Sequence, residues 1–237
     1  MATATESSSP TPSFPETRTL WISDRLSEGE AGLILANGHV MSSYLQPLVT
    51  YCRALGLHTS IRGDPQEIVQ GFFATRLSNT EYLKSWLGSG LRLRQWLRNG
   101  LHHFVHELRR DDAGQANATD SLDEIASTTK RSEDEFERAW ALSALEQAMK
   151  ETIANLERRG KRAEWDIFWM HHVDGHAYSV IAERHQMTAA QAAQRSFAVA
   201  GQVRNALYGI LRKDGALTSE IGVEVAAMME VLHEHGS

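Results

Sequence analysis

Apolar residues recur every three or four positions along most of the chain, which is the spacing of one face of an α-helix. The clearest segment begins at Asp64, which can serve as a helix N-cap and is followed by Pro65, a residue suited to the first helical position. Glu67 can complete a capping box. The apolar face of this helix is expected to comprise Ile68, Val69, Phe72, Phe73 and Leu77.

A second amphipathic helix is expected to end at Arg110. Its apolar stripe comprises Leu93, Trp96, Leu97, Leu101, Phe104, Val105 and Leu108. Its other faces carry Arg92, Arg94, Gln95, Arg98, Asn99, His102, His103, His106, Arg109 and Arg110. Such a face can bind nucleic acid, although taken alone a solvated cationic face is the commoner explanation.

The same periodicity predicts further helices over 28–36, 39–55, 132–159, 163–172, 177–185, 188–213 and 219–233. Asn37-Gly38 is expected to end one helix, and Ser132–Glu135 to open another with a capping box. Pro47 predicts a kink or the true start of its helix. Residues 1–18, rich in Ser, Thr and Pro, are expected to be disordered, and the acidic segment 111–131 is expected to be an interdomain linker.

The pair 177–185 and 188–213 is joined by a connection short enough for a helix-turn-helix unit, whose second helix can enter the major groove. Thr188 and Gln191 form a third capping-box pattern at the start of that helix. Its inner face is expected to comprise Ala193, Phe197, Ala200, Val203, Leu207, Ile210 and Leu211. Many helical hairpins share this spacing, so it is weak evidence by itself.

Composition narrows the class of protein. The chain has 237 residues, 42% of them hydrophobic, few prolines and one cysteine, Cys52. These values favour an all-α fold without intramolecular disulfides, and a reducing cytoplasm. No apolar run has the length of a membrane span. The net charge of −6 argues against nonspecific coating of nucleic acid, but 92–110 holds five arginines and one acidic residue, whereas 111–137 and the tail after Lys213 are acidic.

Both informative segments resemble the same family, the bacterial RNA polymerase sigma factors of the extracytoplasmic-function type, in particular their planctomycete-like variety. Residues 64–77 are similar to the region 2 motif D-x-x-D-[LIV]-V-Q-E-F-F-x-R-L, and 90–110 to its continuation. The helix-turn-helix motif of region 4 is matched by Tyr178, Ile181, Ala182, Met187 and Thr188. Phe136–Trp140 and Leu145–Gln147 also resemble the family, so that the similarity covers roughly residues 20–213.

The resemblance implies two small helical domains. Residues 19–110 would be a region 2 helical bundle that binds core RNA polymerase and the minus-ten element. Residues 111–131 would be a flexible acidic linker, 132–213 a region 4 helix-turn-helix domain, and 214–237 an acidic C-terminal helix. That last helix either caps the second domain or offers a docking surface.

The resemblance also assigns residues. Contacts to polymerase fall on Asp64, Gln66, Glu67, Gln70, Phe73 and Arg76. Phosphate contacts to promoter DNA fall on Arg92, Arg94, Arg98, Arg109 and Arg110. Contacts to bases or to the single strand fall on Gln95, Trp96, Asn99, His102, His103 and His106, although the place of Trp96 on the apolar stripe favours packing. Base contacts to the upstream promoter element would be made by Gln191, Gln194 and Arg195, and Thr188 would cap the helix.

Two departures from the family matter. Gly71 stands where relatives carry Glu, and the recognition helix is rich in alanine with one arginine in its first two turns. The predicted function is a promoter-specificity subunit. The alternative is a degenerate sigma-like regulator that acts by binding polymerase or an anti-sigma factor without opening promoters. No enzymatic signature and no cofactor are expected, and no metal site is assigned, because His171, His172, Asp174 and His176 do not share a familiar ligand spacing.

Overall fold

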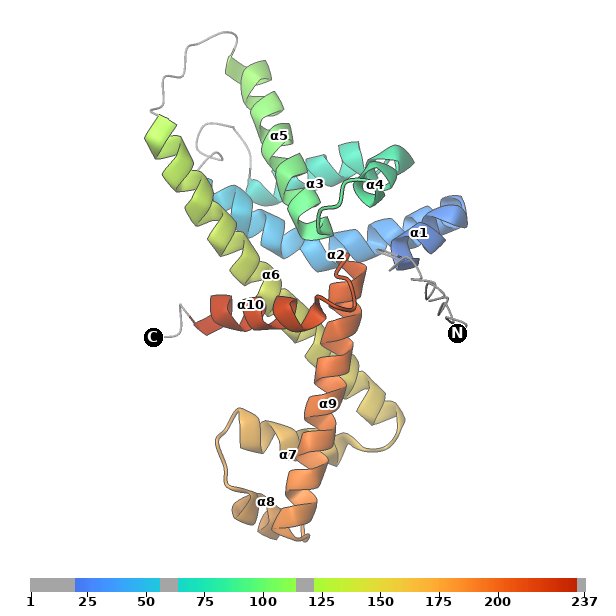
Figure 1. Ribbon diagram of the computed structural model, residues 1–237, viewed down its shortest axis with the longest axis vertical. Helices are drawn as coiled ribbons and strands as arrows, with labels where there is room; N and C mark the ends of the chain where they lie inside the picture. The colour runs from blue at the N-terminus through green and yellow to red at the C-terminus, as the bar shows by residue number, and fades with distance from the viewer. Residues whose placement is uncertain (1–19, 56–63, 114–121, 234–237) are drawn as a thin grey trace, which may run out of the picture.

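The computed structural model describes residues 20–55, 64–113 and 122–233, and this part of the chain is all-helical, as predicted (Figure 1). The first helices are α1 (Leu20–Ser27), α2 (Glu30–Ala54), α3 (Pro65–Arg76), α4 (Thr80–Leu87) and α5 (Leu93–Ala113). They are followed by α6 (Leu122–Arg158), α7 (Arg162–His172), α8 (Tyr178–Arg184), α9 (Ala189–Lys213) and α10 (Ile221–His233). The tail predicted at 1–18 lies outside the described residues.

Several helix boundaries follow the local signals predicted from the sequence. The Asp64 side chain accepts a hydrogen bond from the backbone N–H of Gln66, with Pro65 in the first helical position. Thr188 and Gln191 form the complete capping box at the start of α9. No helix of the described residues is long and apolar enough to cross a membrane.

Two predicted boundaries are wrong. Asn37-Gly38 does not end a helix but lies inside α2, where the Asn37 side chain donates a hydrogen bond to the Leu77 carbonyl at the end of α3. The expected start at Ser132 lies inside α6, and Ser132 is fully buried. Residues 122–131, which the sequence placed in the linker, are therefore helical. In both places tertiary contacts outweigh a local stop or start signal.

The larger apolar core joins segments that lie far apart in the sequence. Tyr44 and Leu48 of α2, Leu97 of α5, Trp140 of α6 and Leu211 of α9 belong to one buried cluster. Helix α6 runs along α2, and its distal part packs against α9, while α10 lies across α6 (Figure 1). A second, smaller cluster joins α7, α8 and the start of α9, and includes Ile167, Ile181 and Ala192. The helix-turn-helix pair thus forms one end of the molecule.

An aromatic layer links α3, α4 and α5. The Phe72 ring lies 5.9 Å from Phe104 and 6.1 Å from Tyr82, and the Tyr82 ring lies 5.6 Å from Trp96. Gly100 faces this layer: a Cβ atom there would lie 2.1 Å from the Tyr82 hydroxyl and 3.2 Å from the Phe72 ring. The absence of a side chain at Gly100 is therefore a packing requirement.

We expect Gly100→Ala to destabilise the protein by about 1–3 kcal/mol, because the buried Tyr82 ring must move to admit the methyl group. Gly201→Ala is the matched control, since a Cβ at Gly201 of α9 meets nothing within 4 Å. That change should stabilise the protein by about 0.5–1 kcal/mol through helix propensity. Urea unfolding of both variants measures the difference. Equal effects of the two substitutions would contradict the tight packing at Gly100.

Candidate nucleic-acid interface

The N-terminus of α5 is capped by a residue from the other end of the chain. Asp214 is the C-cap of α9, and its carbonyl accepts a 2.9 Å hydrogen bond from the backbone N–H of Leu93. Its carboxylate accepts a 2.8 Å hydrogen bond from the backbone N–H of Arg94. These contacts satisfy backbone N–H groups that have no acceptor inside α5. The negative charge of Asp214 also interacts favourably with the positive N-terminal end of the α5 dipole.

The Arg94 side chain is the centre of a buried ionic network. Its guanidinium pairs with Asp214, with Glu137 of α6 at 2.9 Å and with Glu224 of α10 at 2.7 Å. It also lies over the Trp140 ring, 4.3 Å from the ring centroid. The Tyr44 hydroxyl donates a 2.8 Å hydrogen bond to Asp214. Arg94 is 7% exposed and Asp214 fully buried.

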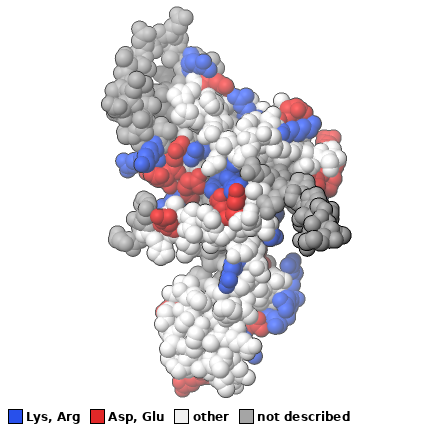
Figure 2. Space-filling view, in the orientation of Figure 1, with Lys and Arg blue, Asp and Glu red and all other residues white. Residues whose placement is uncertain are grey.

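Two further arginines of the predicted DNA face are held in the same way. Arg92 pairs with Glu220 at 2.7 Å and with Glu224 at 2.8 Å, and it donates a hydrogen bond to the Gly215 carbonyl. Arg98 pairs with Glu133 of α6 at 3.1 Å. In Figure 2, basic and acidic side chains lie side by side in the upper part of the molecule, around the level of α10.

The network shifts the pKa values of its members in opposite directions. Partial burial acts to raise the pKa of Glu224, but Arg94 and Arg92 outweigh it and hold the pKa below its ordinary value. Burial acts to lower the pKa of Arg94, and Asp214, Glu137 and Glu224 raise it above its ordinary value. Glu224 and Arg94 are therefore charged at neutral pH. The three arginines already have carboxylate partners where the resemblance predicted phosphates.

A stripe on the other side of α5 is exposed. It comprises Asn99, His103, His106 and Arg110, which follow one another at helical spacing. We call these four residues the α5 stripe. His102 lies beside it, partly buried, and the Arg109 side chain lies outside the described residues. The stripe is the part of the predicted DNA face that this conformation leaves accessible.

Gln95 and Trp96 have local partners. The Gln95 side-chain oxygen accepts a hydrogen bond from the backbone N–H of Arg92. Trp96 is partly buried against the main core, and its Nε1 has no hydrogen-bond partner in the described part of the chain. Packing therefore accounts for most of the Trp96 surface, as its place on the apolar stripe suggested.

Helix α3 presents the candidate polymerase contacts on one exposed side. Asp64, Gln66, Glu67 and Gln70 are exposed, whereas Phe73 is buried. Arg76 pairs with Glu107 of α5 at 2.7 Å. The α3 surface is thus acidic and amide-rich, and Phe73 serves the core instead of a partner.

Helices α8 and α9 form a helix-turn-helix unit. The turn between them passes through Gln186, which has a positive φ of 54°, and the Met187 N–H donates to the Ala182 carbonyl. Gln194 and Arg195 are exposed near the start of α9, and Gln191 is exposed although its side chain closes the capping box. The turn thus joins two helices closely and leaves polar side chains at the start of α9 exposed.

The predicted inner face of α9 is wrong over its first half. The buried positions there are Ala192, Ser196 and Val199, and Phe197 is 73% exposed. The helical spacing of Ala193, Phe197 and Ala200 predicts a face that lies one position away from the buried one. Small residues pack α9 against α7 and α8, and Phe197 faces outward. The face of α7–α9 in Figure 2 is almost free of charged side chains.

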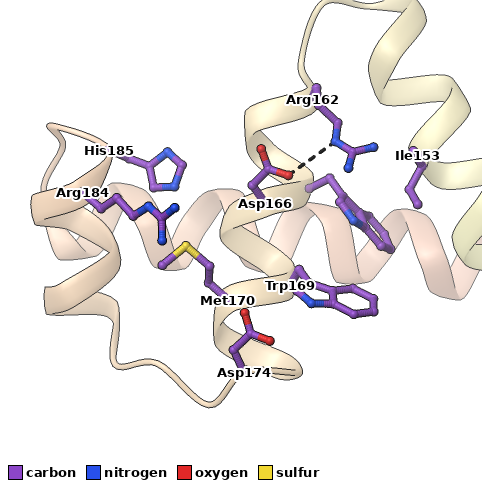
Figure 3. A pocket seen from close by; sticks show the side chains of 9 residues that line it. Ile153, Arg162, Asp166, Trp169, Met170, Asp174, Arg184 and His185 are labelled. Carbon is purple, nitrogen blue, oxygen red and sulfur yellow. Dashed lines mark hydrogen bonds and ion pairs between the residues drawn. The ribbon is translucent and has the colours of Figure 1, made fainter.

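An open groove of about 570 Å³ lies between α6, α7 and α8 (Figure 3). Trp165, Trp169 and Met170 form its apolar part, and Arg162 and Asp166, which are hydrogen-bonded to each other at 3.4 Å, lie at one end. Nearby, the histidines considered as metal ligands have other contacts. His171 stacks on Tyr178 with ring centroids 3.9 Å apart, and His172 packs on Phe168.

The partners of the arginines were missed at the sequence level. The sequence predicts Asp214, Glu220 and Glu224 in the acidic C-terminal helix, Glu133 in a helix-start signal and Glu137 in the acidic segment 111–137, and it assigns none of them to a site. The available signal was charge complementarity between the basic segment 92–98 and the acidic segments that follow it. Comparison of the chain with models of known families, with curated proteins and with solved structures gives no match.

We expect Arg94→Met to destabilise the protein by about 3–5 kcal/mol, because it leaves buried carboxylates without a counter-charge. Arg162→Ala is the control, since it removes ion pairs that are half exposed and should cost at most about 1 kcal/mol. Urea unfolding followed by circular dichroism measures both. A wild-type midpoint for Arg94→Met would show that the network contributes nothing to stability.

The network also predicts a pH dependence of stability. Because the folded-state pKa of Glu224 is lowered, its contribution is present above its unfolded-state pKa of about 4.5 and is lost as the pH falls through the folded-state value. Glu224→Gln should therefore be less stable than the wild type at neutral pH, and the gap should narrow in acid. Urea unfolding at a series of pH values tests this. A difference in the free energy of unfolding that stays constant with pH would contradict the ionic role of Glu224.

Proposed function

We propose that the chain is a sigma-type transcription initiation factor, which binds core RNA polymerase in the bacterial cytoplasm and directs it to promoters. The observation that carries the proposal is the α8–α9 helix-turn-helix unit, which stands at one end of the molecule with Gln194 and Arg195 exposed. The order of motifs along the chain, from the α3–α5 segment to this unit, gives it further support.

In this proposal the two ends of the molecule have different tasks. The exposed side of α3, with Asp64, Glu67 and Gln70, docks on polymerase. The α5 stripe contacts the melting minus-ten element: Asn99 can read a base edge, Arg110 can bind a phosphate, and the imidazoles can stack on unpaired bases. The start of α9 contacts the upstream element.

Intrinsic DNA affinity should be low. Counter-ion release by Lys and Arg supplies most of the affinity of DNA-binding proteins, and here Arg92, Arg94 and Arg98 are engaged by carboxylates. Binding to polymerase would therefore supply the effective concentration that the isolated chain lacks.

A second candidate is a sigma-like regulator that binds polymerase or an anti-sigma factor without opening promoters. Two observations favour it: the ionic network occupies the arginines of α5, and the outer face of α9 offers Ala189, Ala190, Ala198 and the exposed Phe197 with a single arginine, Arg195, in its first turns. An uncharged face of this kind fits a protein better than a phosphate backbone.

Run-off transcription of fragmented genomic DNA with core RNA polymerase tests the proposal. We expect the chain to produce discrete transcripts, and the double change Asn99→Ala with Arg110→Ala to reduce them by roughly tenfold or more, because a base contact and a phosphate contact are both lost. Arg98 is not suitable for this test, since its ion pair with Glu133 couples it to folding.

Lys150→Ala is the matched control, because Lys150 is an exposed cation of α6 that forms an ion pair with Glu146 on the same helix. It should leave transcription unchanged. If the wild-type chain binds core polymerase but yields no transcript from any fragment, the second candidate replaces the first.

A further inference from the structure

Two histidines of α5 face each other one helical turn apart. The Nε2 atoms of His102 and His106 lie 3.1 Å apart, and the ring centroids 4.5 Å apart. At this distance one Nε2–H donates a hydrogen bond to the other Nε2, so both nitrogens point at the same small volume. In a tetrahedral zinc site with Zn–N bonds of about 2.0–2.1 Å, two ligand nitrogens lie only a few tenths of an ångström farther apart.

We infer that His102 and His106 form a two-histidine site for a divalent cation of the imidazole-binding class, with Zn²⁺ as the first candidate. Histidines at i and i+4 of a helix present both rings to one point, which is the spacing used in helical zinc sites. The inference does not depend on the proposed transcription function.

The surroundings of His102 suit a metal ligand. Its Nδ1 lies 3.1 Å from the Tyr51 hydroxyl. When Nδ1 carries the proton and donates it to the Tyr51 oxygen, Nε2 keeps its lone pair for the metal, and the ring orientation is fixed. Histidine ligands of metals are held by a second hydrogen bond of this kind.

The charges close to the histidine pair are balanced. The positive charge of Arg98 opposes a cation, but Glu133 pairs with Arg98 at 3.1 Å and offsets that charge.

Only His102 and His106 supply protein ligands to the proposed metal ion. Within the described ranges, no group of three or more His, Cys, Asp or Glu side chains is arranged to hold a metal ion, so water would fill the remaining positions. This makes the site open and exchangeable. A dication there adds positive charge to the α5 stripe itself, whereas Arg92, Arg94 and Arg98 of the same helix are paired with carboxylates.

Thermal unfolding of the full chain with stepwise additions of ZnCl₂ tests the inference. We expect the midpoint to rise by roughly 3–6 °C at tenfold excess over the dissociation constant, and to return when EDTA is added. MgCl₂ should have no effect, because Mg²⁺ prefers oxygen ligands. His106→Gln should abolish the zinc-dependent rise while the midpoint without metal stays close to wild type, since His106 is exposed.

His103→Gln is the matched control, because His103 is an exposed neighbour whose Nε2 is not part of the pair; it should keep the rise. Side-chain NMR should show the two rings of His102 and His106 shifting together on zinc addition. No midpoint shift in the wild type, an undiminished shift in His106→Gln, or a shift lost equally in His103→Gln would each overturn the assignment.

Discussion

The contact on which the rest of the structure depends is the one between Asp214 and the start of α5. A single buried aspartate ends α9, caps α5 and binds Arg94, so that the end of α9 and the start of α5 meet at one residue. Burying charges in this way costs free energy unless every lone pair and proton has a partner. Tyr44, Glu137, Glu224 and the Trp140 ring supply those partners, and they come from helices α2, α6 and α10. The network therefore joins helices α2, α5, α6, α9 and α10 through one set of buried side chains.

Local sequence signals predicted much of the helical framework and little of its assembly. The caps at Asp64 and Thr188 depend on residues within one turn of each other, and both are observed. Asn37 and Ser132 carry equally good local signals, but Asn37 bonds to Leu77 and Ser132 is buried, so that contacts over long sequence separations decide. Helix α4, which is not among the helices predicted from the sequence, forms because Leu83 and Trp86 are buried against the core.

The candidate surfaces show the same limit. Periodicity placed Asn99, His103, His106 and Arg110 away from the apolar stripe of α5, and all four are exposed. It could not separate them from Arg92, Arg94 and Arg98, since an amphipathic pattern says which side is polar and not what that side meets. The partners come from segments roughly forty or more than a hundred positions away. Phe197 illustrates the converse: helical spacing predicted it to lie in the core, but the small side chains of Ala192 and Ser196 are buried there instead.

Helix α6 also has a geometrical consequence. It is continuous from Leu122 to Arg158, contributes Phe136 and Trp140 to the core beside α2 and α5, and reaches the helix-turn-helix end with Leu156. At 1.5 Å per residue, its 37 residues span roughly 55 Å. Because the helix is continuous, it fixes the distance between the α5 stripe and the start of α9 in this conformation. Two segments of a DNA duplex bound at these surfaces would be separated by a distance that the protein dictates, to which the duplex must conform by twist and bend.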